Sequence, residues 1–184
     1  AIAGIDAITH LMEAYATWKA HPMSKALALQ GLELAGRYLQ RAYDNGEDLE
    51  AREGMSLAAY LGGISFSNSG LGAAHGLGMA INIYYPVPHG FGVGVTLPYV
   101  MEINAKDNPT LYDAVGEVFS GKRYDKPGEG TQVAIQFIKD LNAHMGIPAD
   151  LKELNVTEEL AMTMGNECFG SSMSGNPVQL TGEE

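Results

Sequence analysis

The chain of 184 residues carries 11 basic and 22 acidic side chains, a formal net charge of −11, and 46% of its residues are hydrophobic. This size and composition predict one globular domain, and the excess of negative charge argues against nucleic acid or anionic membranes as partners, because affinity for polyanions comes largely from Lys and Arg. Cys168 is the only cysteine, so a disulfide framework is excluded.

Apolar residues at three- and four-residue spacing predict helices over most of the chain. The expected elements are, in chain order, helices at about 2–20, 24–43, 48–66, 71–83, 90–104, 108–119 and 130–145, a polar loop at 120–129 and a helix that begins at Thr157. The valines of residues 90–104 also suit a strand, but we favour a helix because no alternating partner strand occurs elsewhere. The predicted fold class is all-α.

The ends of the sequence indicate a piece of a longer chain. Ala1 is not an initiator Met, the apolar periodicity is already under way at Ile2, and residues 181–184 resemble the beginning of another helix. We therefore interpret both ends as cuts. The start carries no leader pattern and no apolar run approaches the length of about 20 residues that crosses a membrane, so we expect a cytoplasmic protein without a membrane partner.

Asp6 and His10 lie four residues apart in the first predicted helix, so their side chains leave the same face one turn apart. A carboxylate and an imidazole on a buried face form either a hydrogen-bonded pair or half of a metal site, and taken alone the pair favours the first alternative. His21 and His144 lie at a helix break and a helix end, and we interpret both as structural or surface residues.

His75 and His89 occupy positions that suit a ligand. His75 lies in a run of glycines and alanines that permits close approach, and His89 lies at a Pro-His-Gly turn, although it can equally cap the next helix. With Asp6 and His10 they offer one carboxylate and three imidazoles, which suits a divalent transition metal with one open coordination position. These donors do not separate Fe(II) from Zn(II), and spacing alone leaves a metal site and structural histidines as equal alternatives.

Four blocks of the sequence resemble the iron-containing (group III) alcohol dehydrogenases. They are GIDAITHLMEAY at 4–15, FSNSGLGAAHG at 66–76, YYPVPHGFGVGVTLPYVMEIN at 84–104 and GIPADLKELNV at 146–156. Their order and spacing fit this family along almost the whole chain. The resemblance implies a dehydrogenase with an N-terminal α/β domain that holds NAD or NADP and a C-terminal helical domain that carries the metal. Residues 1–184 resemble only the helical domain.

By matching positions, the resemblance implies that Asp6, His10, His75 and His89 bind Fe(II), with Zn(II) as an alternative, and that Phe66 lines the substrate pocket. It assigns no other catalytic residue here and no residue that binds the dinucleotide. The implied reaction interconverts a small alcohol and its aldehyde or ketone. The implied partners are the missing nucleotide-binding domain and further copies in a homo-oligomer, and the chain by itself is expected to be inactive.

Many family members carry a second histidine four residues after the one that matches His75, and this chain has Met79 there, which cannot transfer a proton. Glu13 is a candidate to support the metal ligands, but we interpret it as a solvated or structural carboxylate.

The alternatives to a dehydrogenase are a non-catalytic helical domain for metal binding or oligomer contacts, and a self-contained metal-dependent lyase or hydrolase.

Overall fold

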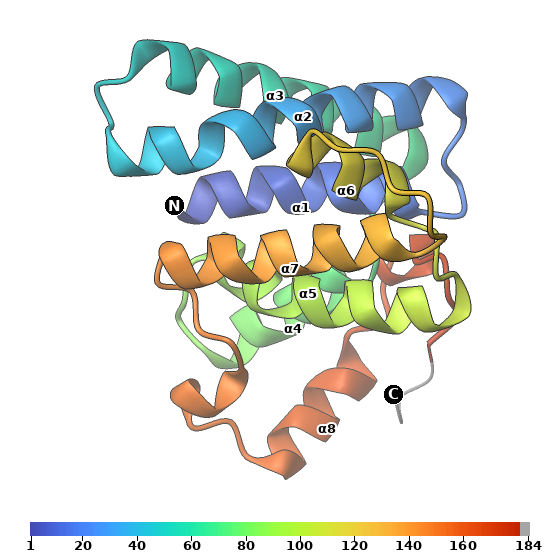
Figure 1. Ribbon diagram of the computed structural model, residues 1–184. Helices are drawn as coiled ribbons and strands as arrows, with labels where there is room; N and C mark the ends of the chain where they lie inside the picture. Colours follow the sequence, from blue (N-terminus) through green and yellow to red (C-terminus); the bar gives the residue numbers. More distant parts are fainter. Residues whose placement is uncertain (181–184) are drawn as a thin grey trace.

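The computed structural model of the chain describes residues 1–180, and every regular element in that part is helical (Figure 1). The elements are α1 (Ile2–Ala16), α2 (Pro22–Asp44), α3 (Leu49–Ser69), α4 (Ala73–Tyr84), α5 (His89–Asp107), α6 (Asp113–Ser120), α7 (Glu129–His144) and α8 (Glu158–Glu167), with short 3-10 helices η1 (Leu151–Leu154) and η2 (Met173–Gly175). The all-α prediction is confirmed, and residues 90–104 are helical. The helix expected to begin at 181–184 lies outside the described residues.

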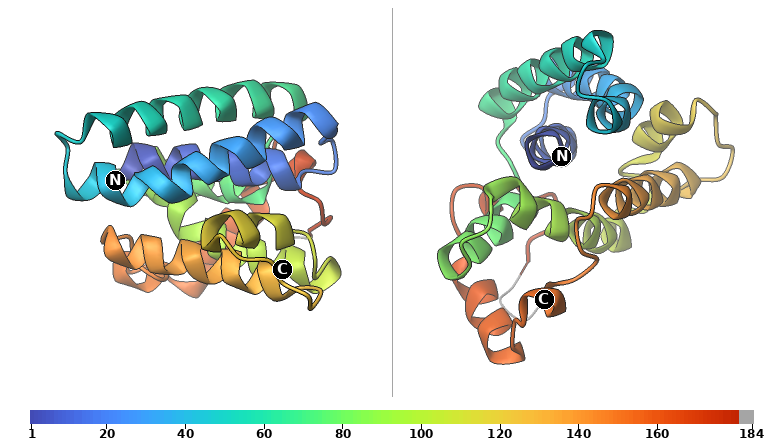
Figure 2. Two further views of the ribbon diagram at one scale, coloured as in Figure 1. Left: turned by 45° about the horizontal axis from the view of Figure 1, so that its top comes forward. Right: turned by 90° about the vertical axis from the view of Figure 1, so that its left-hand side faces the viewer.

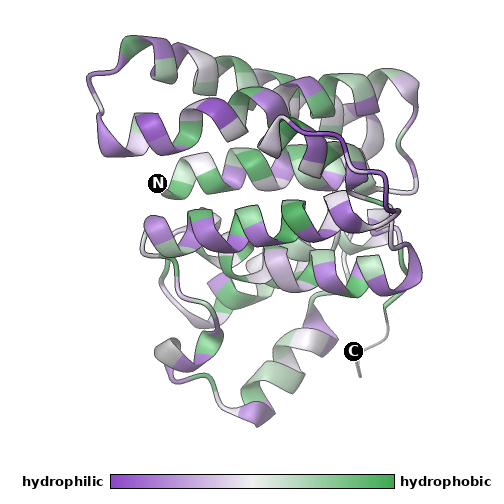
Figure 3. Cartoon of the chain, in the orientation of Figure 1, coloured by the Kyte–Doolittle hydropathy of each residue, from purple (hydrophilic) through white to green (hydrophobic). Residues whose placement is uncertain are grey.

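Helix α1 lies at the centre of the molecule. It packs against α2 and α3 on one side and against α4 and α5 on the other, as the end-on view shows (Figure 2). A helix that is apolar around most of its circumference is typically buried, and Ile5, Ile8, Leu11 and Met12 are fully buried. The apolar character of α1 contrasts with the mixed surface of α2 (Figure 3). None of the described helices has the length and hydropathy needed to cross a membrane.

Two helix boundaries differ from the prediction by four residues or more. Helix α1 ends at Ala16, before residue 20, and the hydroxyl of Thr17 then donates to the carbonyl of Ser69, 3.3 Å away. Helix α6 begins at Asp113, not at 108, because residues 108–112 form a turn after α5. The carboxylate of Asp113 accepts hydrogen bonds from the backbone of Gly128 and Thr131, which ties the start of α6 to the start of α7.

Glycines let the N-terminal end of α5 approach two other helices. A Cβ on Gly92 would lie 2.9 Å from the carbonyl oxygen of Gly78 in α4, closer than packed atoms allow. A Cβ on Gly90 would collide with the carbonyl oxygen of Ile2 in α1. The start of α5 is therefore held against the start of α1, which brings His89 beside the first turns of α1.

Helix α5 also contains a proline, Pro98, which removes the hydrogen bond that the carbonyl of Gly94 would accept inside the helix. Asn142 of α7 replaces it, because its side-chain amide donates to the Gly94 oxygen at 2.8 Å. This bond joins α7 to the middle of α5.

Candidate metal centre

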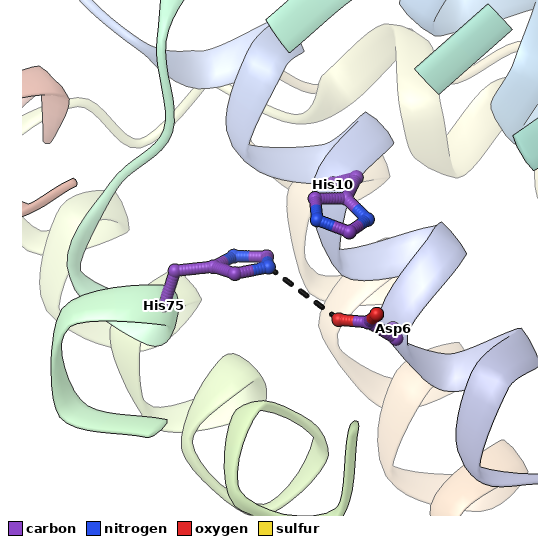
Figure 4. Close-up of side chains that lie close together, drawn as sticks. All are labelled: Asp6, His10 and His75. Carbon is purple, nitrogen blue, oxygen red and sulfur yellow. Dashed lines mark ion pairs between the residues drawn. The ribbon is translucent and has the colours of Figure 1, made fainter. Parts of the chain in front are cut away.

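Three of the predicted ligand residues lie together between α1 and α4. Asp6 and His10 project from α1 toward His75 near the start of α4 (Figure 4). One ligand atom from each of these three side chains can be chosen so that all lie within 4.8 Å of one another. Asp6 and His10 are partly buried, and His75 is only 3% exposed. The i, i+4 spacing predicted the α1 pair, whereas the approach of His75 depends on the packing of α4.

The strongest feature of this cluster is a pair of buried polar atoms that face each other without a hydrogen bond. Asp6 Oδ1 and His75 Nε2 are buried and have no hydrogen-bond partner, and they lie 3.5 Å apart, longer than a normal N–H···O bond. Leaving such groups unsatisfied is costly. An acceptor oxygen and an imidazole nitrogen that share one buried space fit a divalent cation between them.

His89 completes the set from the start of α5. Its Nε2 lies 3.7 Å from Asp6 Oδ1, although it stands outside the tighter group of three, and its side chain is 44% exposed. The other ring nitrogen, Nδ1, lies 3.2 Å from the side-chain oxygen of Asn82, and the Asn82 amide donates to the carbonyl of Val87. Asn82 thus leaves Nε2 of His89 as the nitrogen that faces the cluster. No sequence pattern predicts this role of Asn82.

Glu13 lies behind His75, on the side away from Asp6. It is 5% exposed, so of the two alternatives, a solvated or a structural carboxylate, burial excludes the solvated one. Its Oε2 lies 2.6 Å from Nδ1 of His75, and its Oε1 accepts from the backbone N–H of Ala74 at 2.6 Å. The position of Glu13 one turn beyond His10 was the only sequence signal for this contact.

The charges in the cluster shift the pKa values of its members in opposite directions. Burial lowers the pKa of His75, but the carboxylates of Asp6 and Glu13 outweigh it and raise that pKa to about 9. Burial lowers the pKa of His10, and the neighbouring His75 lowers it further. Burial raises the pKa of Asp6, but the surrounding imidazoles lower it below its ordinary value. At neutral pH and without a metal, the cluster therefore contains an ionised Asp6, a protonated His75 and a neutral His10.

Phe66 and Met79 flank the cluster from two helices. The ring of Phe66 in α3 stacks on His10, with centroids 4.7 Å apart, and His10 also stacks on His75 at 4.4 Å. Met79 lies one turn after His75 in α4 and is 56% exposed. The remaining two histidines lie elsewhere: His21 caps α2 through Ser24, and His144 pairs with Asp44 at the surface.

Comparisons with known proteins agree on one family. The family model for the C-terminal part of the Fe-containing alcohol dehydrogenases matches residues 1–184. The chain is 36% identical to alcohol dehydrogenase 4 of Saccharomyces cerevisiae, with 100% of this chain and 48% of that protein covered. It is 35% identical to 1,3-propanediol dehydrogenase of Citrobacter freundii, with 98% and 48% covered.

The fold of this chain also matches solved structures of the same family. The crystal structure of a 1,3-propanediol oxidoreductase superposes on 100% of this chain with a TM-score of 0.94 and 32% identity, and 48% of that protein is covered. The chain thus spans about half the length of the relatives it matches.

Proposed function

We propose, from the premise that this chain belongs to the Fe-containing alcohol dehydrogenase family as its C-terminal domain, that the intact protein interconverts a small alcohol and its aldehyde or ketone. Electrons pass as a hydride to or from NAD or NADP, chemistry that belongs to the cofactor. The relatives named as alcohol and 1,3-propanediol dehydrogenases support this assignment. The substrate is a small-molecule alcohol or aldehyde.

Asp6, His10, His75 and His89 hold the metal in this proposal, and residues 1–184 form one metal-binding domain. The observation that carries the assignment is that the buried atoms Asp6 Oδ1 and His75 Nε2 face each other at 3.5 Å and make no hydrogen bond within the described residues. The family favours Fe(II), and the same donors accept Zn(II). A divalent metal there supplies Lewis acidity toward the alcohol or carbonyl oxygen.

The exposures of three of the four side chains indicate the side from which substrate arrives. The side chain of His75 is 4% exposed, that of Asp6 is 26% exposed and that of His89 is 44% exposed. Substrate therefore approaches over His89, with Phe66 as an apolar wall beside His10. Met79 cannot carry the alcohol proton, so that proton leaves through water or through the cofactor.

The rest of the reaction needs parts that this chain does not supply. In our proposal the nicotinamide is held by the N-terminal α/β domain of the intact protein, and the cleft between the two domains excludes water during hydride transfer. A homo-oligomer and a cytoplasmic location remain predictions.

The test is metal content and turnover of the intact protein, reconstituted anaerobically with Fe(II) or Zn(II) and assayed for alcohol-dependent reduction of NAD⁺ and NADP⁺. We expect about one metal per chain and turnover in the wild type, and loss of both in His89→Ala. His144→Ala is the matched control, because His144 pairs with Asp44 away from the cluster. Undiminished turnover in a His89→Ala protein that has lost its metal would refute the proposal.

A further inference from the structure

The buried carboxylate of Glu13 is shared between one helix terminus and one imidazole. Helix α4 begins after Gly72, which offers no side chain to cap it. Oε1 of Glu13 takes that place, with the backbone N–H of Ala74 at 2.6 Å and that of His75 at 3.3 Å. A carboxylate at a helix N-terminus is favourable for the helix dipole. Oε2 is left to face Nδ1 of His75 at 2.6 Å.

The rest of the surroundings keep the carboxylate in this orientation. A Cβ on Gly72 would lie 3.0 Å from Glu13 Oε1 and 3.1 Å from the side-chain oxygen of Asn176, so this residue must be small. The side-chain oxygen of Asn176 accepts a hydrogen bond from the N–H of Ala73, the first residue of α4. Each N–H at the start of the helix therefore has an assigned acceptor, and Glu13 cannot turn away from His75 without leaving the helix terminus unsatisfied.

Backbone N–H groups can only donate, and an ionised carboxylate can only accept. With both Glu13 oxygens acting as acceptors, Nδ1 of His75 must carry the hydrogen. When the imidazole is neutral, its lone pair is then on Nε2, the atom that faces Asp6 Oδ1. The orientation and the tautomer of His75 are both set by the group behind it.

We propose that Glu13 is a positioning residue that fixes His75 as an Nε2 metal ligand, in addition to capping α4. The inference rests on the metal site proposed above and extends it by one residue outside the ligand set. Two carboxylates, Asp6 and Glu13, then balance the two positive charges of a divalent ion in a largely buried cluster. Carboxylates that orient metal-bound histidines in this way typically change metal affinity by 10–100-fold when mutated.

The variant Glu13→Gln separates the two roles. The amide oxygen of Gln can still accept from the N–H of Ala74, which is a fixed donor, so the amide nitrogen is turned toward His75. Nδ1 must then accept a hydrogen bond, which moves the imidazole hydrogen to Nε2 and blocks that lone pair. Gln thus preserves the cap but imposes the wrong tautomer, whereas Glu13→Ala removes both interactions.

The experiment measures two quantities on the intact protein: the dissociation constant for Zn(II), by competition with a chelator, and the unfolding temperature of the metal-free form. For Glu13→Gln we expect zinc binding weakened about 10–100-fold. Its unfolding temperature should lie below that of the wild type, because the ion pair with protonated His75 is lost, but above that of Glu13→Ala, because the cap of α4 is kept. For Glu13→Ala we expect the dissociation constant for Zn(II) to rise and the unfolding temperature to fall further, because both interactions are lost. Asn176→Ala is the matched control, since it removes the acceptor for Ala73 without touching His75, and it should lower the unfolding temperature while leaving the zinc affinity within a few-fold.

The proposal is overturned if Glu13→Gln binds zinc as tightly as the wild type, or if its affinity falls only as far as that of Asn176→Ala. His75→Ala tells this failure apart from failure of the metal site itself. If His75→Ala also retains wild-type zinc affinity, the ligand assignment is wrong and the role of Glu13 falls with it. If His75→Ala loses zinc and Glu13→Gln does not, only the positioning role is wrong.

Discussion

The imidazole of His10 stacks on the ring of Phe66, with the two planes 23° apart, so a side chain of α3 sets the orientation of a candidate ligand in α1. Stacked aromatic pairs contribute about 0.5–1.5 kcal/mol beyond the area that they bury. The contact therefore ties the proposed substrate wall to the proposed metal site, and a change in Phe66 should affect both.

Replacement of Phe66 by Ala should weaken zinc binding by about two- to tenfold, because the stacking energy that holds His10 is lost. The same change should raise the KM for the alcohol more than it lowers kcat. Chelator competition and steady-state kinetics on the intact protein measure these effects. Tyr60→Ala in the same helix is the control, since Tyr60 is 66% exposed. Equal effects of the two substitutions would remove Phe66 from the site.

The raised pKa of His75 predicts a pH dependence for the metal-free protein. Its pKa is raised from 6.5 to about 9 in the folded state, so its protonated form stabilises the fold fully below about pH 6.5. That stabilisation, up to about 3 kcal/mol, is lost as the pH rises through 9. Urea unfolding of the metal-free protein across this interval should show the decline.

Metal binding should displace the same proton, because a ligand nitrogen must be unprotonated. Calorimetry of Zn(II) binding at pH 7.5 in buffers of different ionisation enthalpy should report release of about one proton. His75→Gln, which lacks the titrating imidazole, should abolish the decline in stability of the metal-free protein. His144→Gln should leave both effects in place, and a decline that persists in His75→Gln would assign it to another group.

Gly90→Ala tests the close approach of α5 to α1. A Cβ there would collide with the carbonyl oxygen of Ile2, so the start of α5 must move away and take His89 with it. We expect destabilisation of about 1–3 kcal/mol together with weaker zinc binding. Gly46→Ala is the control, because a Cβ on Gly46 meets nothing within 4 Å. Wild-type zinc affinity in Gly90→Ala would show that His89 does not depend on this contact.

The chain of residues 1–184 on its own should not reduce NAD⁺ or NADP⁺ with any alcohol, even when it is loaded with Fe(II) or Zn(II). The proposed hydride acceptor is held by the other domain, so half of the reaction centre is missing. Absorbance of the reduced nicotinamide in the presence and absence of alcohol measures this. A rate above the blank with the pure chain would show that the nucleotide binds to these helices and that our domain assignment is wrong.

The parts of this structure that the sequence predicts are those that depend on near neighbours. The spacing of Asp6 and His10 places them on one helix face, and Thr157 caps the start of α8, whose first turn is acidic as predicted. The helical state of residues 90–104 follows from the absence of a partner strand. The first two inferences use residues within one or two turns of each other, and the third uses the hydropathy pattern of the rest of the sequence.

The parts that the sequence does not predict depend on how distant segments pack. Nothing in the spacing shows that the start of α4 meets Glu13, so the sequence leaves a solvated carboxylate as one alternative. Asn82 was unrecognised for the same reason. The start of α6 was misplaced because the acceptor that fixes it, Asp113, has its partners fifteen and eighteen residues later in the chain. Residue types suggested the donor set, but only the fold brings His75 and His89 to Asp6.

The contact between the starts of α1 and α5 has a consequence for how the chain resists opening. An ion held by Asp6 and His89 would act as a cross-link that closes a loop containing α2, α3 and α4. A cross-link of this kind restricts the unfolded ensemble in the way that a disulfide does, in a chain whose single cysteine cannot form one internally. Removing the ion should therefore speed amide hydrogen exchange first in the opening turns of α1 and α5, while the central turns of α1 remain protected.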